Sequence, residues 1–197
     1  MKKYLITGCA GFIGSNFVHY MLKKYPEILL VNLDKLTYAG NLENLKDVEG
    51  DPRHVFVQGD ICDKELVESL FAKYDFDYVI NFAAESHVDR SIKNPEIFVQ
   101  SNVMGTVNLL QRAKEAWYDA DAKTWKEGKK YLQVSTDEST ALWVPRATSW
   151  RPPRCAPTAP IPPPRPALIC SLWHSTILRY AHQHYPLLQQ LRPLSVP

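Results

Sequence analysis

Two adjacent acids, Asp137 and Glu138, and the hydroxyl of Thr136 come directly after a short apolar run that is typical of a strand. Neighbouring carboxyl groups suit a reaction in which one group removes a proton and the other protonates a leaving hydroxyl, provided that their surroundings separate their pKa values. The threonine hydroxyl is suited to hold a hydroxyl of the substrate. Acids are also common at a turn or helix start after a strand, and the residue types alone favour neither interpretation.

A glycine-rich segment near the N-terminus predicts a dinucleotide site. Residues 7–14 read T-G-C-A-G-F-I-G, with glycines at positions 8, 11 and 14. Glycines let the backbone turn tightly and approach a pyrophosphate, whose charge a helix N-terminus stabilises. Such a triad alone can also be an ordinary tight turn. Asp34 favours the dinucleotide because it ends a second apolar run, 20 residues beyond Gly14. Its carboxylate would bind ribose hydroxyls and repel a 2′-phosphate, which favours NAD over NADP, although the adjacent Lys35 weakens this preference.

The elements that must position these residues alternate between strands and helices. Apolar, β-prone runs predict strands at Lys3–Thr7, Ile28–Leu33, Val55–Gln58, Tyr78–Phe82 and Tyr131–Val134. Helical spacing predicts a helix at Phe12–Lys24, a second one capped by Asp63 that buries Leu66, Val67, Leu70 and Phe71, and a long one opened by Asn94 and Pro95. This alternation predicts an α/β fold, a doubly wound parallel sheet of the Rossmann type.

Ligands of such sheets bind at the carboxyl ends of the strands, and the unusual polar motifs of this chain all fall there. Asp60 follows the third predicted strand, where it could reach the adenine or, alternatively, cap a helix. The motifs therefore predict one ligand site that is assembled from several loops.

Four further segments carry a resemblance to a known family. Their sequences are D-K-L-T-Y-A-G-N at 34–41, F-A-A-E-S-H-V-D-R-S at 82–91, N-V-M-G-T at 102–106 and S-T-D-E at 135–138. Together with the G-x-x-G-x-x-G spacing, they resemble the extended short-chain dehydrogenase/reductases and, within these, the dTDP-glucose 4,6-dehydratases. The resemblance covers residues 1–138 and implies NAD as the cofactor, dTDP-glucose as the substrate and a homodimer whose helices include part of 94–118. No metal site is predicted, because the six His show no helical pair with an acidic partner.

The resemblance also implies site residues. For the cofactor these are Gly8, Gly11, Phe12, Ile13, Gly14, Asp34, Lys35, Leu36, Thr37, Asp60, Ile61, Phe82, Ala83, Ala84, Glu85, Ser86 and Ser101. Ser86 and Thr136 would contact the sugar. In that family NAD takes a hydride from carbon 4 of the glucose, and the new ketone acidifies carbon 5. By analogy Glu138 would remove the proton on carbon 5, Asp137 would protonate the hydroxyl leaving carbon 6, and the returned hydride would complete a 4-keto-6-deoxy sugar.

The composition changes abruptly after residue 138. Every Gly, Asp, Glu and Lys lies in residues 1–138, whose 17 Lys and Arg against 21 Asp and Glu give a charge of −4. Residues 139–197 hold 12 of the 15 Pro and carry a charge of +6 from six Arg. The basic balance thus belongs to 139–197 and does not indicate nucleic-acid binding by 1–138. The sequence therefore predicts two regions, an NAD-binding domain at 1–138 and an irregular Pro- and Arg-rich tail at 139–197.

The tail departs from the family, which continues S-T-D-E with V-Y-G and later supplies a catalytic Tyr with a Lys four residues beyond it. No Lys follows residue 138. With suitable synonymous codons, a family-like V-Y-G-A-L-G-P read one base out of frame becomes the S-T-A-L-W-V-P of residues 139–145. A second offset can account for Tyr180–Pro197 in the same way. We therefore hypothesise that 139–197 is translated out of frame and that this chain has little or no turnover.

Two alternatives remain open from the sequence. One is a non-catalytic NAD-binding module with a Pro-rich interaction tail, since residues 160–165 fit P-x-x-P-x-R. The other is a UDP-hexose 4-epimerase-like enzyme, which would have no use for a second acid. The four Cys show no disulfide framework, and no apolar run is long enough for a signal peptide or a membrane span. We therefore expect a cytoplasmic protein.

Overall fold

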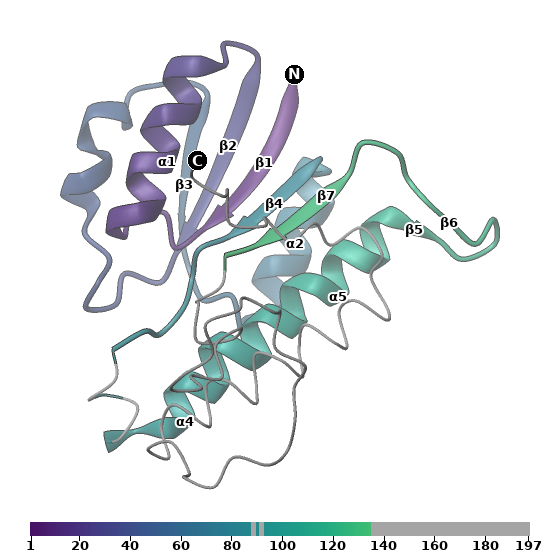
Figure 1. The fold of residues 1–197 in the computed structure, drawn as a ribbon. Coiled ribbons are helices and arrows are strands. Elements are labelled where there is room, and N and C mark those ends of the chain that lie inside the picture. The colour runs from purple at the N-terminus through teal and green to yellow at the C-terminus, as the bar shows by residue number, and fades with distance from the viewer. Residues whose placement is uncertain (88–89, 91–92, 135–197) are drawn as a thin grey trace, which may run out of the picture.

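The computed structural model describes residues 1–87, 90 and 93–134, in which five parallel strands form one sheet (Figure 1). The strands are β1 (Lys2–Thr7), β2 (Ile28–Asp34), β3 (His54–Gln58), β4 (Tyr78–Asn81) and β7 (Lys130–Gln133). Their order is β3-β2-β1-β4-β7. The chain first adds strands on one side of β1 and then on the other, which confirms the predicted doubly wound α/β sheet and places its switch point between β1 and β4.

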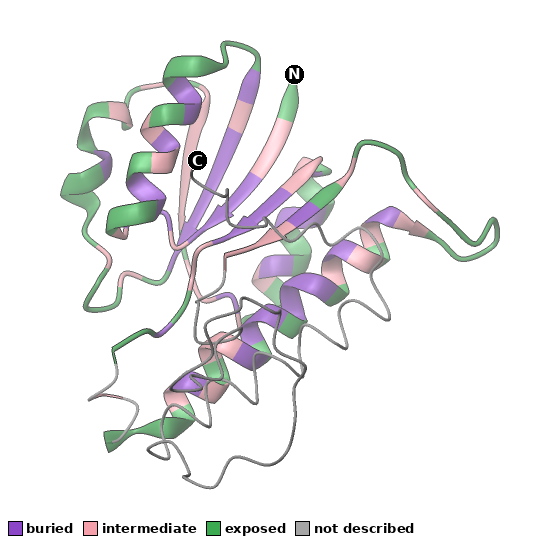
Figure 2. Cartoon of the chain, in the orientation of Figure 1, coloured by how far each residue is buried: buried purple, intermediate pink, exposed green. Residues whose placement is uncertain are grey.

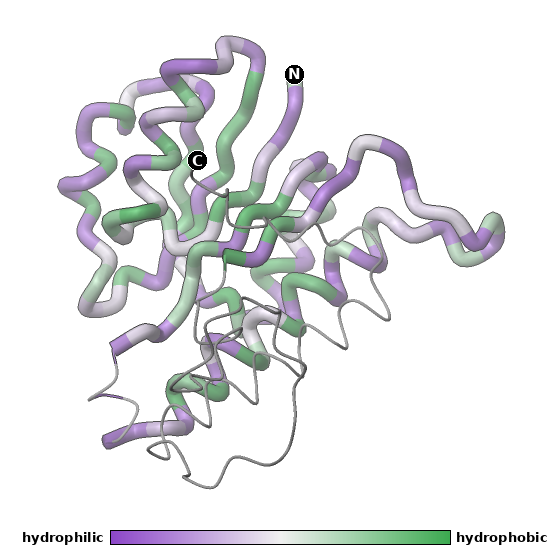
Figure 3. The backbone as a smooth tube through the Cα atoms, viewed as in Figure 1, coloured by the Kyte–Doolittle hydropathy of each residue, from purple (hydrophilic) through white to green (hydrophobic). Residues whose placement is uncertain are grey.

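Helices cover both faces of this sheet. On one face lie α1 (Phe12–Lys24) and the 3₁₀ helix η1 (Leu42–Val48), and on the other face α2 (Lys64–Tyr74) packs against α5 (Thr106–Trp117). Figure 2 shows the buried residues concentrated on the sheet and on the helix sides that face it. Figure 3 shows β2 as hydrophobic over most of its length. Apolar runs buried on both faces are characteristic of parallel strands, which explains why β2 could be predicted from its continuous apolar sequence.

Local signals set most of the helix boundaries. The predicted cap of α2 is confirmed, because the carboxylate of Asp63 accepts a hydrogen bond from Leu66 N–H at 3.0 Å. Val67, Leu70 and Phe71 are buried as predicted, whereas Leu66 is only half-buried. The helix ends at Asp75, whose left-handed φ of 43° stops further helical hydrogen bonding.

The long helical stretch predicted from Asn94 is present in three consecutive parts. It begins with α4 (Pro95–Phe98), passes through a π-helical segment, η2 (Val99–Gly105), and continues as α5. A π-helical turn inside a helix often marks a functional site. Here it brings Gly105 against Ile61, where an added Cβ would lie 2.5 Å from the side chain of Ile61.

Two elements were not predicted. One is η1, and the other is a short antiparallel hairpin of β5 (Tyr118–Asp119) and β6 (Thr124–Trp125) that projects from the end of α5 (Figure 1). Within the described part of the chain, no helix is long and apolar enough to cross a membrane. Thr136, Asp137, Glu138 and residues 139–197 lie outside the described residues.

Candidate functional site

In the glycine loop between β1 and α1, close packing by itself requires glycine at two positions, Gly8 and Gly14. Gly8 has a φ of +67°, a left-handed conformation that glycine adopts without strain. A Cβ at Gly8 would lie 2.6 Å from the backbone nitrogen of Ala83, and a Cβ at Gly14 would lie 2.2 Å from the carbonyl oxygen of Gly8. Gly8 therefore lets the loop touch the end of β4, and Gly14 lets α1 pack closely on the loop.

Gly11 is different, because packing does not require it. Among the described residues, a Cβ there would approach the carbonyl oxygens of Gly8 at 3.4 Å and of Ala39 at 3.9 Å, which are ordinary contact distances. Gly11 is also the N-cap of α1, and no side chain caps that end of the helix. Phe12 and Ile13 in the first turn are exposed. An open helix N-terminus beside a small residue is the arrangement that binds the negative charge of a pyrophosphate.

Asp34 at the end of β2 binds this loop through hydrogen bonds. The side chain is buried, its Oδ2 accepts a hydrogen bond from Ala10 N–H at 2.8 Å, and its Oδ1 accepts one from Leu36 N–H at 2.8 Å. The carbonyl oxygen of Ala10 in turn accepts from Asn41 N–H at 3.0 Å and from Asn44 Nδ2 at 2.9 Å. Each carboxylate oxygen has a second lone pair. Asp34 can therefore hold the loop and still accept the ribose hydroxyls that the sequence predicted.

The turn after Asp34 carries backbone strain. Leu36 has a φ of 56°, and a bulky residue in this left-handed region costs roughly 1–3 kcal/mol, a kind of strain that clusters at ligand sites. Gly40 folds back onto the same carboxylate, since a Cβ there would lie 2.9 Å from Asp34 Oδ1. Between them, Thr37 is exposed and its carbonyl oxygen accepts from Gly40 N–H at 3.0 Å. The turn thus surrounds the carboxylate on which the predicted ribose contact depends.

An ion pair joins the loops after β2 and β3. Lys35 Nζ lies 2.6 Å from Asp60 Oδ2, and Asp60 Oδ1 accepts from Cys62 N–H at 2.9 Å. The hydrogen bond to Asp60 raises the pKa of Lys35. Burial alone would raise the pKa of Asp60, but Lys35 and the Cys62 N–H outweigh it and hold the pKa below its ordinary value. Since α2 is capped by Asp63 instead, the alternative of Asp60 as a helix cap is wrong. Ile61 beside it is buried.

The loop after β4 holds a buried carboxylate oxygen that has no hydrogen-bond partner among the described residues, Oε2 of Glu85. Its backbone is fixed by Asn102 of η2, whose Oδ1 accepts from Glu85 N–H at 2.8 Å and whose Nδ2 donates to the Glu85 carbonyl at 2.9 Å. A buried acceptor without a partner costs about 1–3 kcal/mol. A ligand hydroxyl or N–H that reached this oxygen would remove that cost, which makes Glu85 a candidate ligand contact.

Nearly all predicted site residues lie at the carboxyl end of the sheet. Ser86 is exposed beside Glu85, and Ser101 on η2 is half-buried next to Asn102 in the chain. No role was predicted for Asn41, Asn44 and Asn102, because an asparagine carries no sequence signal for a partner that is 17 to 34 residues away. The remaining predictions group by strand, with Gly8–Gly14 after β1, Asp34–Thr37 after β2, Asp60 and Ile61 after β3, and Phe82–Ser86 after β4.

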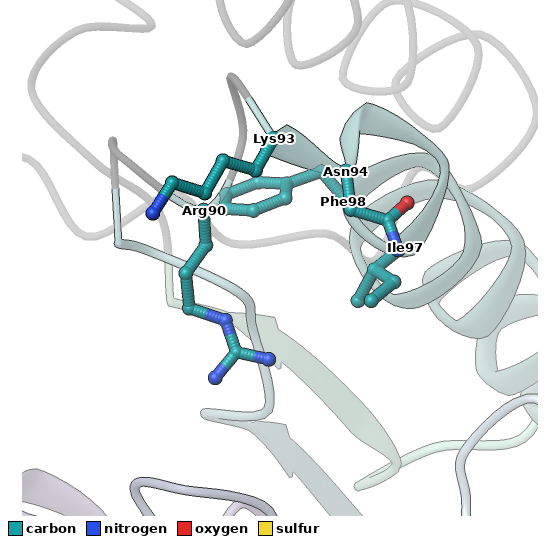
Figure 4. A pocket seen from close by; sticks show the side chains of 5 residues that line it. All are labelled: Arg90, Lys93, Asn94, Ile97 and Phe98. Atoms are coloured by element: carbon teal, nitrogen blue, oxygen red, sulfur yellow. The ribbon is translucent and has the colours of Figure 1, made fainter.

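A separate concave region opens beside α4, with a volume of about 240 Å³ and a lining of Arg90, Lys93, Asn94, Ile97 and Phe98 (Figure 4). None of these five lining residues was predicted to bind the cofactor. The volume is also below the roughly 300–1,000 Å³ that is usual for small-molecule sites. The guanidinium of Arg90 is 4.0 Å from the ring centre of Tyr38 and forms a cation–π contact with it. The residues predicted for the dinucleotide site therefore lie along the open edge of loops described above and do not line this cavity.

Comparisons with known proteins point to one family. The family model described as GDP-mannose 4,6 dehydratase matches residues 5–139. Among curated proteins, the dTDP-glucose 4,6-dehydratase of Xanthomonas campestris pv. campestris (strain B100) is 50% identical over 138 residues, which make up 70% of this chain and 38% of that protein. The chain thus spans less than half the length of the relatives that it matches.

Solved structures are similar as well. The dTDP-glucose 4,6-dehydratase of Streptomyces venezuelae, solved with NAD bound, has a TM-score of 0.71 and 37% identity over 94% of this chain and 53% of that one. The UDP-glucose 4-epimerase of Thermus thermophilus, also in complex with NAD, has a TM-score of 0.66 and 26% identity over 94% of this chain and 52% of that one. Both a dehydratase and an epimerase therefore share this fold.

Proposed function

Because the chain belongs to the GDP-mannose 4,6-dehydratase family, we propose that residues 1–138 form the NAD-binding part of a nucleotide-sugar 4,6-dehydratase whose substrate is dTDP-glucose. The observation that carries this proposal is the glycine loop. It leaves the N-terminus of α1 without a side-chain cap and has a glycine, Gly11, that packing does not require, beside the buried carboxylate of Asp34. That set of groups fits a pyrophosphate and an adjoining ribose. The dehydratases and the epimerase that were solved with NAD support the same cofactor.

Each loop would make its own contribution to holding the cofactor. The first-turn N–H groups of α1 would bind the pyrophosphate, and Asp34 would accept the ribose hydroxyls. Asp60 and Ile61 would lie beside the adenine, while the loop Phe82–Ser86 would follow the cofactor toward the nicotinamide. Lys35 supports NAD over NADP, because its ammonium is already paired with Asp60 instead of standing free for a 2′-phosphate.

The chemistry would take place where β1, β4 and β7 end. NAD, when bound, supplies a hydride acceptor that can return the hydride. Ser86 and Thr136 would hold the sugar, Glu138 would remove the proton on carbon 5, and Asp137 would protonate the hydroxyl that leaves carbon 6. The product would be dTDP-4-keto-6-deoxyglucose and water. The adjacent acids distinguish this reaction from that of the alternative, a UDP-hexose 4-epimerase, because an epimerase eliminates no water and needs no second acid.

The tail limits what this chain can catalyse. Because no Lys follows residue 138, the family's Tyr–Lys base is absent from the printed sequence, and its loss lowers the rate on the order of 10²–10⁴-fold. We therefore expect little or no 4-keto product when the chain is incubated with dTDP-glucose and NAD, and wild-type-like turnover would contradict this. We further propose that the protein is cytoplasmic, and that homodimer formation by residues 94–118 depends on the rest of the family's chain.

The origin of residues 139–197 has a direct test. The out-of-frame hypothesis requires codons for 136–145 that restore the family sequence V-Y-G when they are read in another frame. Sequencing the coding DNA across these codons decides it, and codons that cannot give V-Y-G in any frame would favour a genuine Pro-rich interaction tail.

The cofactor proposal is tested by titrating the purified chain with NAD and with NADP in a calorimeter. We expect NAD to bind more tightly than NADP, and Asp34→Asn to weaken NAD binding about tenfold through the lost carboxylate–ribose bonds. Asp77→Asn is the matched control. Asp77 is also a partly buried carboxylate that accepts a backbone N–H, from Lys3 at 2.9 Å, but it lies at the opposite end of the sheet. Equal affinities for NAD and NADP, or equal losses in both variants, would contradict the assignment.

A further inference from the structure

Three neighbouring strands end on polar residues that lie side by side. Thr7, Asn81 and Gln133 are the last residues of β1, β4 and β7. The strand register pairs Thr7 with Asn81 and Asn81 with Gln133, so the three side chains stand in one row across the sheet. Thr7 and Asn81 have no exposed surface at all. Parallel strands that are covered on both faces are mainly apolar, so a buried polar row of this kind needs internal hydrogen bonds.

The side-chain amide of Asn81 joins this row and uses all of its hydrogen-bonding capacity within the protein. Its Oδ1 accepts from the hydroxyl of Thr7 and from Ala83 N–H at 3.1 Å. Its Nδ2 donates to Gln133 Oε1 at 2.9 Å and to Thr106 Oγ1 at 3.5 Å. An amide has two acceptor and two donor positions. The Ala83 N–H can only donate, which fixes the orientation of the amide, and no position is left for a ligand.

Gln133 extends the network toward the segment that carries the acid pair. Its Oε1 also accepts from Tyr131 O–H at 3.0 Å, and its Nε2 donates to the carbonyl of Val134 at 3.2 Å. The N–H of Val134 donates to the Asn81 carbonyl at 3.1 Å. Side chain and backbone thus both attach the start of the segment leaving β7 to Asn81.

We propose that Asn81 is a positioning residue that fixes three segments relative to one another: the glycine loop, the loop Phe82–Ser86 and the chain that leaves β7 at Val134. The glycine loop begins one residue after Thr7, and Phe82–Ser86 begins directly after Asn81. A fully satisfied buried network is rigid and specifies one arrangement. This inference rests on the proposed function, because only the proposed reaction requires the cofactor loops to be aligned with the acid pair.

The experiment compares Asn81→Leu, Gln133→Leu and the double variant in the full chain, with folding of each checked by circular dichroism. The NAD dissociation constant should rise about tenfold in Asn81→Leu, although the Asn81 amide has no position free for NAD, and several-fold in Gln133→Leu. The double variant should bind like Asn81→Leu alone, because both substitutions break one network. The control is Asn32→Leu, since Asn32 is equally buried in β2 but its amide has no hydrogen-bond partner among the described residues, so its removal should leave NAD affinity unchanged.

A second measurement needs no ligand. In the free chain, Gln133→Leu should speed hydrogen exchange at Ala83 N–H about tenfold, whereas Asn32→Leu should not change it. If Asn81→Leu does not fold, Gln133→Leu at the edge of the described sheet decides the question. Unchanged exchange at Ala83 together with unchanged NAD affinity overturns the inference. Faster exchange at Ala83 in Gln133→Leu, together with no NAD binding by the wild-type chain, would support the network and refute the proposed cofactor.

Discussion

The two ends of the sheet use their charged groups differently. At the amino end the acids and bases pair with one another, as shown by Asp77 Oδ1, which lies 3.1 Å from Lys129 Nζ. Arg53 pairs with Asp51 at 2.6 Å and also donates to the carbonyl of Tyr25 at the C-terminal end of α1, at 3.0 Å. The helix carbonyls that would otherwise lack partners are thus bound by the chain itself.

At the carboxyl end, bonding capacity is left over. The N-terminus of α1 has no side-chain cap, Glu85 Oε2 is buried without a partner among the described residues, and Phe12 and Ile13 are exposed. The contrast is not absolute, because Lys35 and Asp60 form an ion pair at the carboxyl end. At the amino end, the buried Nε2 of His54 is also unpartnered within the described part of the chain. The charged groups at the amino end thus support the fold, whereas the carboxyl end leaves hydrogen-bonding positions that a ligand could use.

The largest effect is expected from Gly8→Ala, which would show that the glycine loop is also needed for folding. The substitution adds left-handed strain of about 1–2 kcal/mol and a steric clash of about 1–3 kcal/mol, so the free energy of unfolding should fall by roughly 2–5 kcal/mol. Two controls separate the terms in urea unfolding. Gly128→Ala shares the positive φ, at 77°, but an added Cβ there meets no atom of the described residues within 4 Å, and the same holds for Gly50→Ala, which has no positive φ. Equal losses for Gly8→Ala and Gly128→Ala would mean that the contact with Ala83 is not tight.

Asp77→Ala tests the amino end and should lower stability by about 1–3 kcal/mol, because it leaves the Lys3 N–H without its acceptor. The NAD dissociation constant of the folded variant should remain that of the wild type. Calorimetric titration next to urea unfolding measures both quantities. A variant that loses NAD affinity without losing stability would reverse the roles that we assign to the two ends.

The pH dependence of stability sharpens this prediction. Burial acts to raise the pKa of Asp77, but the Lys3 N–H and the Lys129 ammonium outweigh it and hold the pKa below the ordinary value of 3.8. A lowered folded-state pKa means that the stabilisation is fully present above the unfolded value and is lost as the pH falls through 3.8 and below. Urea unfolding between about pH 6 and pH 2.5 should therefore show a shallower loss in Asp77→Ala than in the wild type. Parallel curves of stability against pH for Asp77→Ala and the wild type would show that folding does not lower the pKa of Asp77.

The smallest effect is expected from Lys35→Gln. The Lys35–Asp60 ion pair is partly exposed to solvent, so its loss should change the free energy of unfolding by no more than about 1 kcal/mol. The preference for NAD over NADP should persist, because Asp34 and not Lys35 determines it. If Lys35→Gln markedly weakened NADP binding, Lys35 would have to be reassigned as a contact of the 2′-phosphate.

The sequence predicted the parts of the fold that depend on local patterns. Continuous apolar runs indicated the strands, and the Asp63 cap and the spacing of Val67, Leu70 and Phe71 indicated α2. The hairpin β5–β6 escaped prediction because its two-residue strands depend on the packing of Tyr118 against Trp125, with ring centres 5.1 Å apart. Its strands are too short to show an alternating pattern.

The site was predicted as a set of loop residues but not as a network. Glycine spacing and the distance to Asp34 are local signals that the sequence displays directly. The bonds of Asn102 to Glu85 and of Asn81 to Thr7 and Gln133 connect residues 17 to 74 positions apart. The register of the sheet brings Asn81 together with Thr7 and Gln133, and the position of η2 beside the loop after β4 brings Asn102 to Glu85. No spacing rule could have identified these pairs.

The central claim is that the open helix N-terminus at Gly11 binds the pyrophosphate of NAD, and one titration tests it most directly. Gly11→Ala should fold like the wild type, because the added Cβ meets only ordinary contact distances among the described residues. The same methyl group would occupy the space that the pyrophosphate needs. The account predicts saturable 1:1 binding of NAD by the wild-type chain and a loss of at least tenfold in Gly11→Ala at unchanged stability. A folded wild-type chain that binds no NAD, or a Gly11→Ala variant that binds it equally well, would contradict the account.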